Sequence, residues 1–308
     1  MIDLIIVNYK STDLLHECLD SVYSKVNGTP TNVFVFDNGS QDHIHLIPYN
    51  FPKTKLIQND RNLGFSRAIN RVLKRTSSPY VVVLNPDTVV NHGFFESVLS
   101  FMEKNSDVGI LGPKIFDSDG CIQGSARSFP TFSSAFFGRK SLLTKIFPNS
   151  RLTRANILTK NNDGKTPMEV DWVSGACMMV RRKALDKVGL LDERFFLYWE
   201  DIDWCKRRWD NGWKVTYFPQ ASVEHTVGGS SEQRLLGSIF DFHRSAYRFY
   251  CKENLKYGSI LKPLIFLGLS LRFAGILSLQ VGRRYLVNYR EKNKKYLSKR
   301  RTYSDLAN

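Results

Sequence analysis

The sequence predicts an α/β fold with a mostly parallel sheet flanked by helices, and two observations lead to this prediction. Short apolar runs bounded by turn residues recur through the first 85 residues, and apolar residues at helical spacing lie between them. Strands that alternate with helices form parallel sheets of the Rossmann-like, doubly wound kind. A chain of 308 residues, of which 42% are hydrophobic, is long enough for one large or two modest domains.

The expected elements follow this alternation. In the first half we expect strands at residues 3–9, 32–36, 56–58 and 80–85, and helices at 14–22 and 66–75. The polar, irregular stretch that comes next, residues 116–168, fits either a loop over a site or a variable surface excursion. Beyond it we expect a strand at 170–180, a helix at 182–188 and a strand at 214–219.

Polar residues stand at the ends of three of these strands. They are Asn8 and Tyr9, then Asp37 and Asn38, then residues 85–88 with the sequence NPDT. Any turn would use such residues, so each cluster alone has a plain structural explanation. Because the carboxyl ends of parallel strands meet at one edge, where α/β sheets bind ligands, the three clusters together favour a ligand site.

Residues 195–208 place three carboxylates, Glu200, Asp201 and Asp203, among five aromatic side chains. Charge beside so much apolar surface is costly unless it is used or neutralised. A cleft that holds a metal or a proton-accepting carboxylate would use it, and so would the N-terminus of a helix. On such a helix Asp203 either caps the N-terminus or pairs with Arg207.

The net charge of +15 is uneven along the chain. Residues 252–308 hold thirteen Lys or Arg and three Asp or Glu, a net charge of +10, so the first 251 residues carry only +5. A basic nucleic-acid-binding core is therefore not expected, and we expect no nucleic-acid partner.

The five cysteines are widely spread and contain no CxxC pair. This pattern indicates reduced thiols in the cytosol, and it argues against a disulfide framework and against a zinc site. The N-terminal apolar run is too short for a signal peptide and predicts a strand that opens directly into the fold.

Six stretches spread over residues 1–231 carry a family pattern. They are IIVNYKS (5–11), FDNGSQD (36–42), NDRNLGFSRAIN (59–70), LNPDT (84–88), VSGACMMVRRKALDKVGLLDERFFLYWEDIDWCKRRWDNGW (173–213) and VEHTVGGSS (223–231). In this order they resemble the family 2 glycosyltransferases, an inverting group with the GT-A fold. Within that family the pattern is most similar to the rhamnosyltransferase-like enzymes of bacterial surface polysaccharide assembly.

The resemblance implies a divalent cation, Mn²⁺ or Mg²⁺, which neutralises the departing diphosphate of a nucleotide-sugar donor. In this family an Asp-x-Asp-like motif after the fourth strand contacts the metal, and here it reads Asn85-Pro86-Asp87. Asp87 is the matching metal ligand, and one acid of the motif is replaced by Asn85. His225 matches a histidine that completes the metal site in some relatives, although a histidine after a strand is often structural.

The resemblance also assigns the chemistry. Asp201 matches the catalytic base, which takes the proton of the acceptor hydroxyl as that oxygen attacks the anomeric carbon. Glu200 is implied to orient the acceptor. Trp172 and Trp199 are candidate platforms on which the acceptor sugar stacks, and each is equally well explained as a buried aromatic.

The matching residues for nucleotide-sugar binding surround the strand ends. They are Val7, Asn8, Tyr9, Asp37, Asn62, Gly64, Phe65, Arg67, Asn70 and Asn85. Asp37 matches the residue that binds the base or the ribose. Gly64 permits close backbone approach, and the helix that begins near Ser66 offers its amides to phosphate. Arg67 either adds charge there or is solvated.

The resemblance and the composition divide the chain into a catalytic domain, residues 1–251, and a C-terminal region, residues 252–308. Within the first, the nucleotide-binding half spans about residues 1–115 and the acceptor half about 116–251. Residues 260–281 are nearly continuously apolar, with Arg272 in the middle, and a basic cluster extends to residue 301. Such a segment suits a helix lying in the interface of an anionic membrane. A helix packed on the core and a homodimer interface are the alternatives.

The sequence therefore predicts an inverting, metal-dependent glycosyltransferase, peripheral on the cytoplasmic face of the cell membrane. The implied donor is dTDP-rhamnose, with a UDP-hexose or UDP-N-acetylhexosamine as the alternative, and the implied acceptor is a glycan on a polyprenyl diphosphate. A nucleotidyltransferase would usually carry a Gly-rich basic loop after the first strand, and residues 8–11 (NYKS) lack it. A non-catalytic polyanion- or membrane-binding protein is the third alternative.

Overall fold

A computed structural model describes residues 1–26, 28–40, 42–131, 146, 149–226, 235–253 and 262–280. The chain divides into two compact units, Met1–Leu235 and Leu236–Asn308. The predicted boundary between residues 251 and 252 falls near the end of helix α9 (Leu235–Glu253) and stays a prediction.

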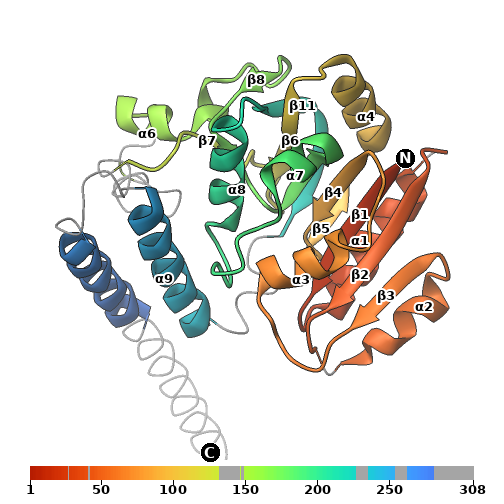
Figure 1. Cartoon of the computed structure of the whole chain (residues 1–308), viewed down its shortest axis with the longest axis horizontal. Helices are drawn as coiled ribbons and strands as arrows, with labels where there is room; N and C mark the ends of the chain where they lie inside the picture. The colour runs from red at the N-terminus through yellow and green to blue at the C-terminus, as the bar shows by residue number, and fades with distance from the viewer. Residues whose placement is uncertain are drawn as a thin grey trace, which may run out of the picture. The chain divides into compact units, whose positions relative to one another are not determined.

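Strands and helices alternate through the first half of the first unit (Figure 1). The strands are β1 (Ile2–Asn8), β2 (Thr31–Asp37), β3 (Thr54–Gln58), β4 (Tyr80–Leu84), β5 (Thr88–Val90), β6 (Val108–Phe116), β7 (Ala126–Arg127), β8 (Met168–Glu169), β9 (Trp172–Val173), β10 (Cys177–Arg181) and β11 (Lys214–His225). The helices of this unit are α1 (Thr12–Lys25), α2 (Ile47–Asn50), α3 (Phe65–Leu73), α4 (Phe94–Lys104), α6 (Arg151–Asn156), α7 (Arg182–Val188) and α8 (Glu200–Trp209), with 3₁₀ turns η1 (His43–Leu46) and η3 (Leu158–Asn161).

The main sheet has nine strands, eight of them in the order β3-β2-β1-β4-β10-β6-β11-β5, while β8 pairs with β11. The first four strands of this order are parallel, as the alternation of strands and helices predicted. Strand β10 runs antiparallel between β4 and β6, and β5 runs antiparallel to β11. The α/β fold with a mixed, largely parallel sheet between helices is thus confirmed.

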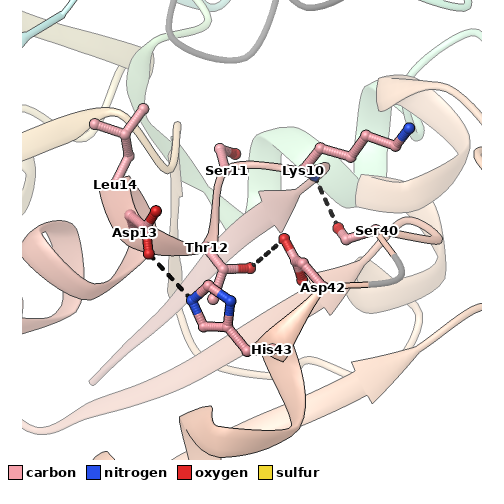
Figure 2. Close-up of a pocket in the computed structure, with 8 residues that line it drawn as sticks. All are labelled: Lys10, Ser11, Thr12, Asp13, Leu14, Ser40, Asp42 and His43. Atoms are coloured by element: carbon pink, nitrogen blue, oxygen red, sulfur yellow. Dashed lines mark hydrogen bonds and ion pairs between the residues drawn. The ribbon is translucent and has the colours of Figure 1, made fainter.

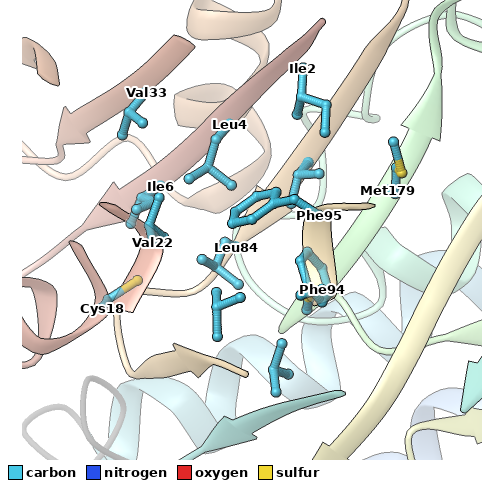
Figure 3. Packing of buried hydrophobic residues seen from close by; sticks show 14 of the residues in the cluster. Ile2, Leu4, Ile6, Cys18, Val22, Val33, Leu84, Phe94, Phe95 and Met179 are labelled. Atoms are coloured by element: carbon cyan, nitrogen blue, oxygen red, sulfur yellow. The ribbon is translucent and has the colours of Figure 1, made fainter. Parts of the chain in front are cut away.

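Alternate residues of β1 enter different hydrophobic clusters, because successive side chains of a strand point to opposite faces. Leu4 and Ile6 pack in one cluster with apolar residues of α1 and α4, where Phe94 and Phe95 meet edge to face (Figure 3). Ile5 packs in a second cluster with residues of α3, α7 and α8. Helices therefore cover both faces of the sheet. The candidate functional residues lie at the edge where the parallel strands end.

One predicted strand is wrong. Residues 170–180 do not form a single strand, because the chain turns at residues 174–176 between β9 and β10. The apolar pattern continues across the break, so the sequence periodicity did not reveal it. The strand predicted at 214–219 also continues to His225, with register shifts against β6 that let it carry on to the sheet edge.

All five cysteines are free thiols in this structure. Cys18, Cys177 and Cys205 are buried, and burial raises the pKa of each thiol. These three side chains are packing residues of the two clusters.

The second unit contains α9 and a helix over Lys262–Gln280. Phe273 lies against Phe240 and His243 of α9, with ring centroids 6.3 Å and 5.5 Å away, and Phe266 meets Tyr247 at 5.8 Å. The Lys262–Gln280 helix is long and apolar enough to cross a membrane by length and composition, with a mean hydropathy of 1.5. The predicted C-terminal apolar helix is confirmed, whereas the basic cluster beyond residue 281 lies outside the described residues.

Candidate functional site

The polar strand ends meet at one edge of the sheet, as predicted. In the parallel register Asn8 stands opposite Asp37, and two residues before it Ile6 stands opposite Leu84, the last residue of β4. The residues after β4, beginning with Asn85, therefore emerge at the same edge. Val7 is buried beneath this edge within the second cluster.

Asn8 and Asp37 are locked together at this edge. The Asn8 amide donates to the Asp37 carboxylate (3.3 Å) and to Ser40 Oγ (3.1 Å). Ser40 also donates to Asp37 through its hydroxyl and its backbone N–H. Asp37 is only 3% exposed, so the structure shows it as an organiser of the β1 and β2 ends. Its predicted contact with a nucleotide stays a prediction, and Oδ2, which among the described residues accepts only the Ser40 N–H, is the oxygen with room for a further donor.

A hollow of about 410 Å³ lies next to these strand ends, at the start of α1 (Figure 2). Two pairs bridge its walls: Thr12 donates to Asp42 at 2.7 Å, and Asp13 lies 3.1 Å from His43. The side chain of Lys10 extends away from both pairs. The lining, as far as the described residues show, includes none of the predicted site residues, and we assign it no role.

The predicted donor-binding loop is held by side-chain amides. Asn38 accepts a hydrogen bond from the Leu63 N–H and donates to Asn62, which in turn accepts from the Gly64 N–H at 2.8 Å. Gly64 has φ +84°, and a Cβ atom there would lie 2.6 Å from the ring of Phe196. Only glycine fits this position, because both the backbone conformation and the space exclude a side chain.

This loop contacts the carboxylate segment, which lies more than a hundred residues later in the sequence. The Phe65 N–H donates to the Phe196 carbonyl at 2.7 Å. Asn70 exchanges two hydrogen bonds with the backbone of Leu191 and donates to Glu193. Arg67 forms a solvated ion pair with Glu193, at 3.6 Å. The structure thus shows Phe65 and Asn70 as braces between the two halves of the site.

The carboxylate segment enters α8 through two strained residues. Tyr198 (φ +65°) and Trp199 (φ +70°) both adopt the left-handed conformation, which costs a non-glycine residue about 1–3 kcal/mol and often marks a functional site. The helix begins at Glu200, and Asp203 pairs with Arg207 at 2.9 Å. That pair confirms one of the two roles predicted for Asp203, and it leaves Glu200 and Asp201 to be explained.

The turn between β9 and β10 joins Asp201 to the end of β4. The Gly175 N–H donates to Asp201 Oδ2 at 3.0 Å, and the Ile202 N–H donates to Oδ1 at 2.9 Å. One residue later, the Ala176 carbonyl accepts from the Asn85 N–H at 2.9 Å. A single turn therefore fixes the candidate base relative to the Asn-Pro-Asp motif.

Glu200 and Asp201 differ in their hydrogen-bond partners and in how burial shifts their pKa values. Glu200 is 6% exposed, and its Oε2 has no hydrogen-bond partner among the described residues. Burial raises the pKa of Glu200 well above its ordinary value, and the charge of Asp201 raises it further. Burial also raises the pKa of Asp201, while the N–H groups of Gly175 and Ile202 oppose the rise.

The positive electrostatic potential at the N-terminus of α8 stabilises the charged forms of both Glu200 and Asp201. This effect is too small to offset the rise in pKa that burial causes. A helix terminus stabilises a nearby anion by about 0.3–2 kcal/mol. Desolvation of a buried carboxylate costs several kcal/mol. The N–H groups of Gly175 and Ile202 donate to Asp201, so burial raises the pKa of Glu200 well above its ordinary value while these donors lower the pKa of Asp201.

The two predicted metal ligands lie side by side. Thr88 of β5 pairs with His225 of β11, and the Thr226 N–H donates to the Asp87 carbonyl at 3.0 Å. This pairing brings His225 Nε2 to 3.2 Å from Asp87 Oδ1. Both side chains are largely buried, at 13% and 6% exposed. The contact lacks hydrogen-bond geometry, so Oδ1 is a buried oxygen with no hydrogen-bond partner in the described part of the chain.

The residues present fit a divalent cation. A carboxylate oxygen and an imidazole nitrogen are ligands for Mn²⁺ and Mg²⁺-type sites, and an orphaned buried oxygen is a typical place for one. Within the described ranges no group of three or more His, Cys, Asp or Glu side chains is placed to hold a metal. Asp87 and His225 would therefore share the cation with donor and water oxygens.

The two tryptophans differ in exposure. Trp172 is partly exposed, donates from its ring nitrogen to the Ser128 carbonyl at 2.9 Å, and carries the Arg127 guanidinium 5.6 Å from its ring centroid. Trp199 is only 9% exposed. A stacking platform needs an accessible face, so Trp172 is the better placed of the two.

Comparison with known proteins identifies the family. The profile of glycosyl transferase family 2 matches residues 3–189, which is more than half of the chain. The chain belongs to glycosyl transferase family 2. This family 2 chain is therefore a glycosyltransferase, and the nucleotidyltransferase and non-catalytic alternatives are set aside.

Two relatives sharpen the comparison. The chain is 30% identical over 266 residues to the N-acetylglucosaminyl-diphospho-decaprenol L-rhamnosyltransferase of Mycobacterium tuberculosis, covering 82% of this chain and 85% of the relative. It is 21% identical over 239 residues to the dTDP-rhamnosyl transferase RfbF of Shigella flexneri, covering 77% and 73%. The resemblance to rhamnosyltransferases of polysaccharide synthesis is thus confirmed at the level of similarity.

Solved structures confirm the GT-A fold. The structure of GalNAc-T7 with UDP, GalNAc and Mn²⁺ superposes with a TM-score of 0.55 and 14% identity, over 73% of this chain. The family 2 chain spans 44% of the length of that structure. At this identity the likeness concerns the fold alone.

Sequence reasoning missed three residues of the site. Gly175 donates to the candidate base, Arg127 stacks on Trp172, and Gln123 contacts His225. Gly175 lay inside a presumed strand, and the other two lay in the stretch interpreted as irregular. The glycine in an apolar run is the one signal that pointed to a turn.

Proposed function

We propose that this family 2 enzyme transfers a rhamnosyl group from dTDP-rhamnose to a glycan on a polyprenyl diphosphate, with inversion at the anomeric carbon. The similarity to two rhamnosyltransferases supports the donor, and the activity for which the mycobacterial relative is named supports a lipid diphosphate acceptor. The observation that carries the mechanism is the 174–176 turn, which ties Asp201 to the Asn85–Asp87 end of β4.

In the proposed reaction Asp201 is the base. The acceptor oxygen attacks the anomeric carbon, the bond from that carbon to the diphosphate breaks, and its electron pair leaves with the diphosphate. The hydroxyl proton passes to Asp201, whose raised pKa makes it a better proton acceptor than an ordinary aspartate. Glu200 is proposed to lie beside the acceptor as a neutral acid, and Trp172 to support the sugar ring.

Asp87 and His225 would hold the divalent cation. When bound, the cation supplies positive charge to the leaving diphosphate. The braces from Asn62, Gly64 and Asn70 fix the donor loop against the carboxylate segment, so donor and base are held in one geometry. Direct donor contacts by Tyr9, Asp37, Arg67 and Asn85 are part of the proposal.

The test is donor turnover by the full chain. Purified protein with Mn²⁺ or Mg²⁺ is incubated with dTDP-rhamnose, UDP-glucose and UDP-N-acetylglucosamine, with and without bacterial lipid extract, and released nucleoside diphosphate is measured. Metal-dependent turnover of dTDP-rhamnose above the UDP-sugars supports the proposal. Preference for a UDP-sugar would contradict the donor and leave the mechanism standing, whereas turnover without added metal in EDTA would contradict the cation.

We further propose that the enzyme acts while peripheral on the cytoplasmic face of the membrane. The Lys262–Gln280 helix leaves five large apolar residues more than half exposed to solvent. They are Leu264, Phe266, Leu267, Leu271 and Leu279. An apolar face next to the basic residues of the C-terminus suits the interface of an anionic bilayer, where a polyprenyl-linked acceptor is also found.

Sedimentation with lipid vesicles tests this location. The full chain should bind vesicles that contain phosphatidylglycerol more strongly than vesicles of phosphatidylcholine alone, and salt should weaken the binding. The double variant Leu267→Glu, Leu271→Glu should lose vesicle binding while keeping turnover of soluble donor. Unchanged binding by this variant would contradict insertion of the helix.

A further inference from the structure

Gln123 is a buried amide beside His225 that the proposed reaction does not use. It is 3% exposed, and its backbone N–H donates to the Ile115 carbonyl at 2.8 Å, so its position next to β6 is fixed. Its side-chain nitrogen donates to Asp117 Oδ1 and, at 2.9 Å, to the carbonyl of His225. Its side-chain oxygen lies 3.4 Å from His225 Nδ1.

The orientation of this amide follows from its neighbours. A carboxylate oxygen and a backbone carbonyl only accept hydrogen bonds, so the NH₂ group must face Asp117 and the His225 carbonyl. The amide oxygen is then the group that faces His225 Nδ1. A flipped amide would set three acceptors against one another, which the network excludes.

The amide in turn fixes the histidine. Because the Gln123 oxygen only accepts, Nδ1 must carry the proton and donate it. In the neutral imidazole this leaves a lone pair on Nε2, the nitrogen that lies 3.2 Å from Asp87 Oδ1. In that tautomer the Nε2 lone pair faces Asp87 Oδ1, and a divalent cation between them would bind both atoms.

We infer that Gln123 is a positioning residue for the divalent cation: it holds His225 in the Nδ1–H tautomer, so that Nε2 and Asp87 bind the metal together. This inference rests on the proposed metal site. Gln123 itself touches neither metal nor substrate. Asp117 completes the chain by fixing the amide that fixes the ring.

Mn²⁺ affinity of the full chain tests the inference, measured from the electron paramagnetic resonance signal of free Mn²⁺, with Mn²⁺ alone and with added dTDP. Gln123→Met keeps the size of the side chain and removes the acceptor, and we expect it to weaken Mn²⁺ binding by about 10–100-fold. Gln220→Met, the same change at an exposed site on β11, should leave the affinity unchanged.

The outcomes separate the inference from the proposed metal site. Wild-type affinity in a folded Gln123→Met would overturn the role of Gln123 and leave the metal site standing. Absence of Mn²⁺ binding by the wild type, or binding that survives Asp87→Ala and His225→Ala, would overturn the metal site together with the inference.

A second measurement does not depend on metal affinity. The ¹⁵N chemical shifts of the His225 ring, assigned by comparison with His225→Ala, report which nitrogen carries the proton in the metal-free protein. We expect the Nδ1–H tautomer in the wild type and in Gln220→Met, and a shift towards Nε2–H in Gln123→Met. A purely structural role for Gln123 would not move this signal, so an unchanged tautomer in a folded Gln123→Met would overturn the inference.

Discussion

Asp87 and Asp201 are both carboxylates beside the β4 end and the 174–176 turn, yet their neighbours differ. Asp201 accepts two backbone N–H groups, which hold it in place and favour its anion. Asp87 Oδ1 has no such donor within the described residues and instead faces a histidine nitrogen. The difference underlies the two proposed roles: backbone donors position Asp201 as the proposed base, and the facing histidine nitrogen favours Asp87 as the proposed metal ligand.

Removal of the base should give the largest effect. Asp201→Asn keeps the shape of the side chain and removes its ability to take a proton, so we expect kcat to fall by about 10²–10⁴-fold with little change in donor affinity. Single-turnover assays and donor titrations measure the two quantities. Asp210→Asn, at the end of the same helix and paired with Lys206 at the surface, is the matched control and should keep full activity. A fall in kcat below tenfold would show that another group takes the proton.

Removal of the metal ligand should act on a different quantity. Asp87→Asn replaces the charged oxygen with a neutral one, and we expect Mn²⁺ affinity to fall by about 10–100-fold while the tautomer of His225 is retained. Higher Mn²⁺ should restore part of the activity of Asp87→Asn and none of the activity of Asp201→Asn. Rescue of both variants by metal would contradict the proposal that Asp201 is the base and Asp87 the metal ligand.

The pH dependence tests how Glu200 and Asp201 share their proton. Asp201 must be ionised to act, and its raised pKa places the acid limb of kcat/KM above the ordinary range of an aspartate. If Glu200 is neutral, Glu200→Gln should leave that limb in place. An ionised Glu200 would raise the pKa of Asp201, so its replacement would move the limb to lower pH. The kcat/KM profile of both proteins measures this.

The raised pKa of Glu200 should also make the stability of the protein depend on pH. A carboxyl whose folded pKa is raised must take up a proton on folding once the pH exceeds its unfolded pKa, so its contribution to stability falls as the pH rises above that value. As the pH rises above the ordinary range of a glutamate, the free energy of unfolding of the wild type should therefore decrease relative to that of Glu200→Gln. Parallel curves for the two proteins would contradict a neutral Glu200.

The smallest effect concerns the brace that holds the two halves together. Gly64→Ala forces an alanine into an extended backbone with positive φ and adds a contact with Phe196, and we expect the free energy of unfolding to fall by about 1–3 kcal/mol. Gly189→Ala has nearly the same φ and ψ and nothing within 4 Å of its added Cβ, so it isolates the backbone strain. A larger loss of donor affinity in Gly64→Ala than in Gly189→Ala would link the brace to the site, and equal losses would not.

Local pattern predicted the first half of the fold well. The strands near Asn8, Asp37 and Asn85 were found because apolar runs ended in turn residues, and parallel pairing then placed their ends at one edge. The pairing of Asp203 with Arg207 followed from helical spacing alone. Periodicity failed at Gly175, because apolar residues on both sides of the turn made residues 170–180 look like one strand.

Long-range contacts were beyond such reasoning. Gln123 meets His225 across about a hundred residues, and Phe65 meets Phe196 across a similar distance. Neither contact produces a recognisable pattern in the sequence, because each depends on which strands become neighbours in the sheet. The antiparallel insertion of β10 between β4 and β6 decides those neighbours.

The sequence by itself determined the α/β class, the family pattern and the identity of the acidic groups, because these depend on local composition and order. Only the tertiary structure decided which carboxylate receives backbone donors, which faces a histidine, and which has its pKa raised most strongly by burial. Those properties depend on burial and on hydrogen-bond partners that distant segments provide. The roles proposed for Glu200, Asp201 and Asp87 therefore depend on the residues around them and do not follow from residue type alone.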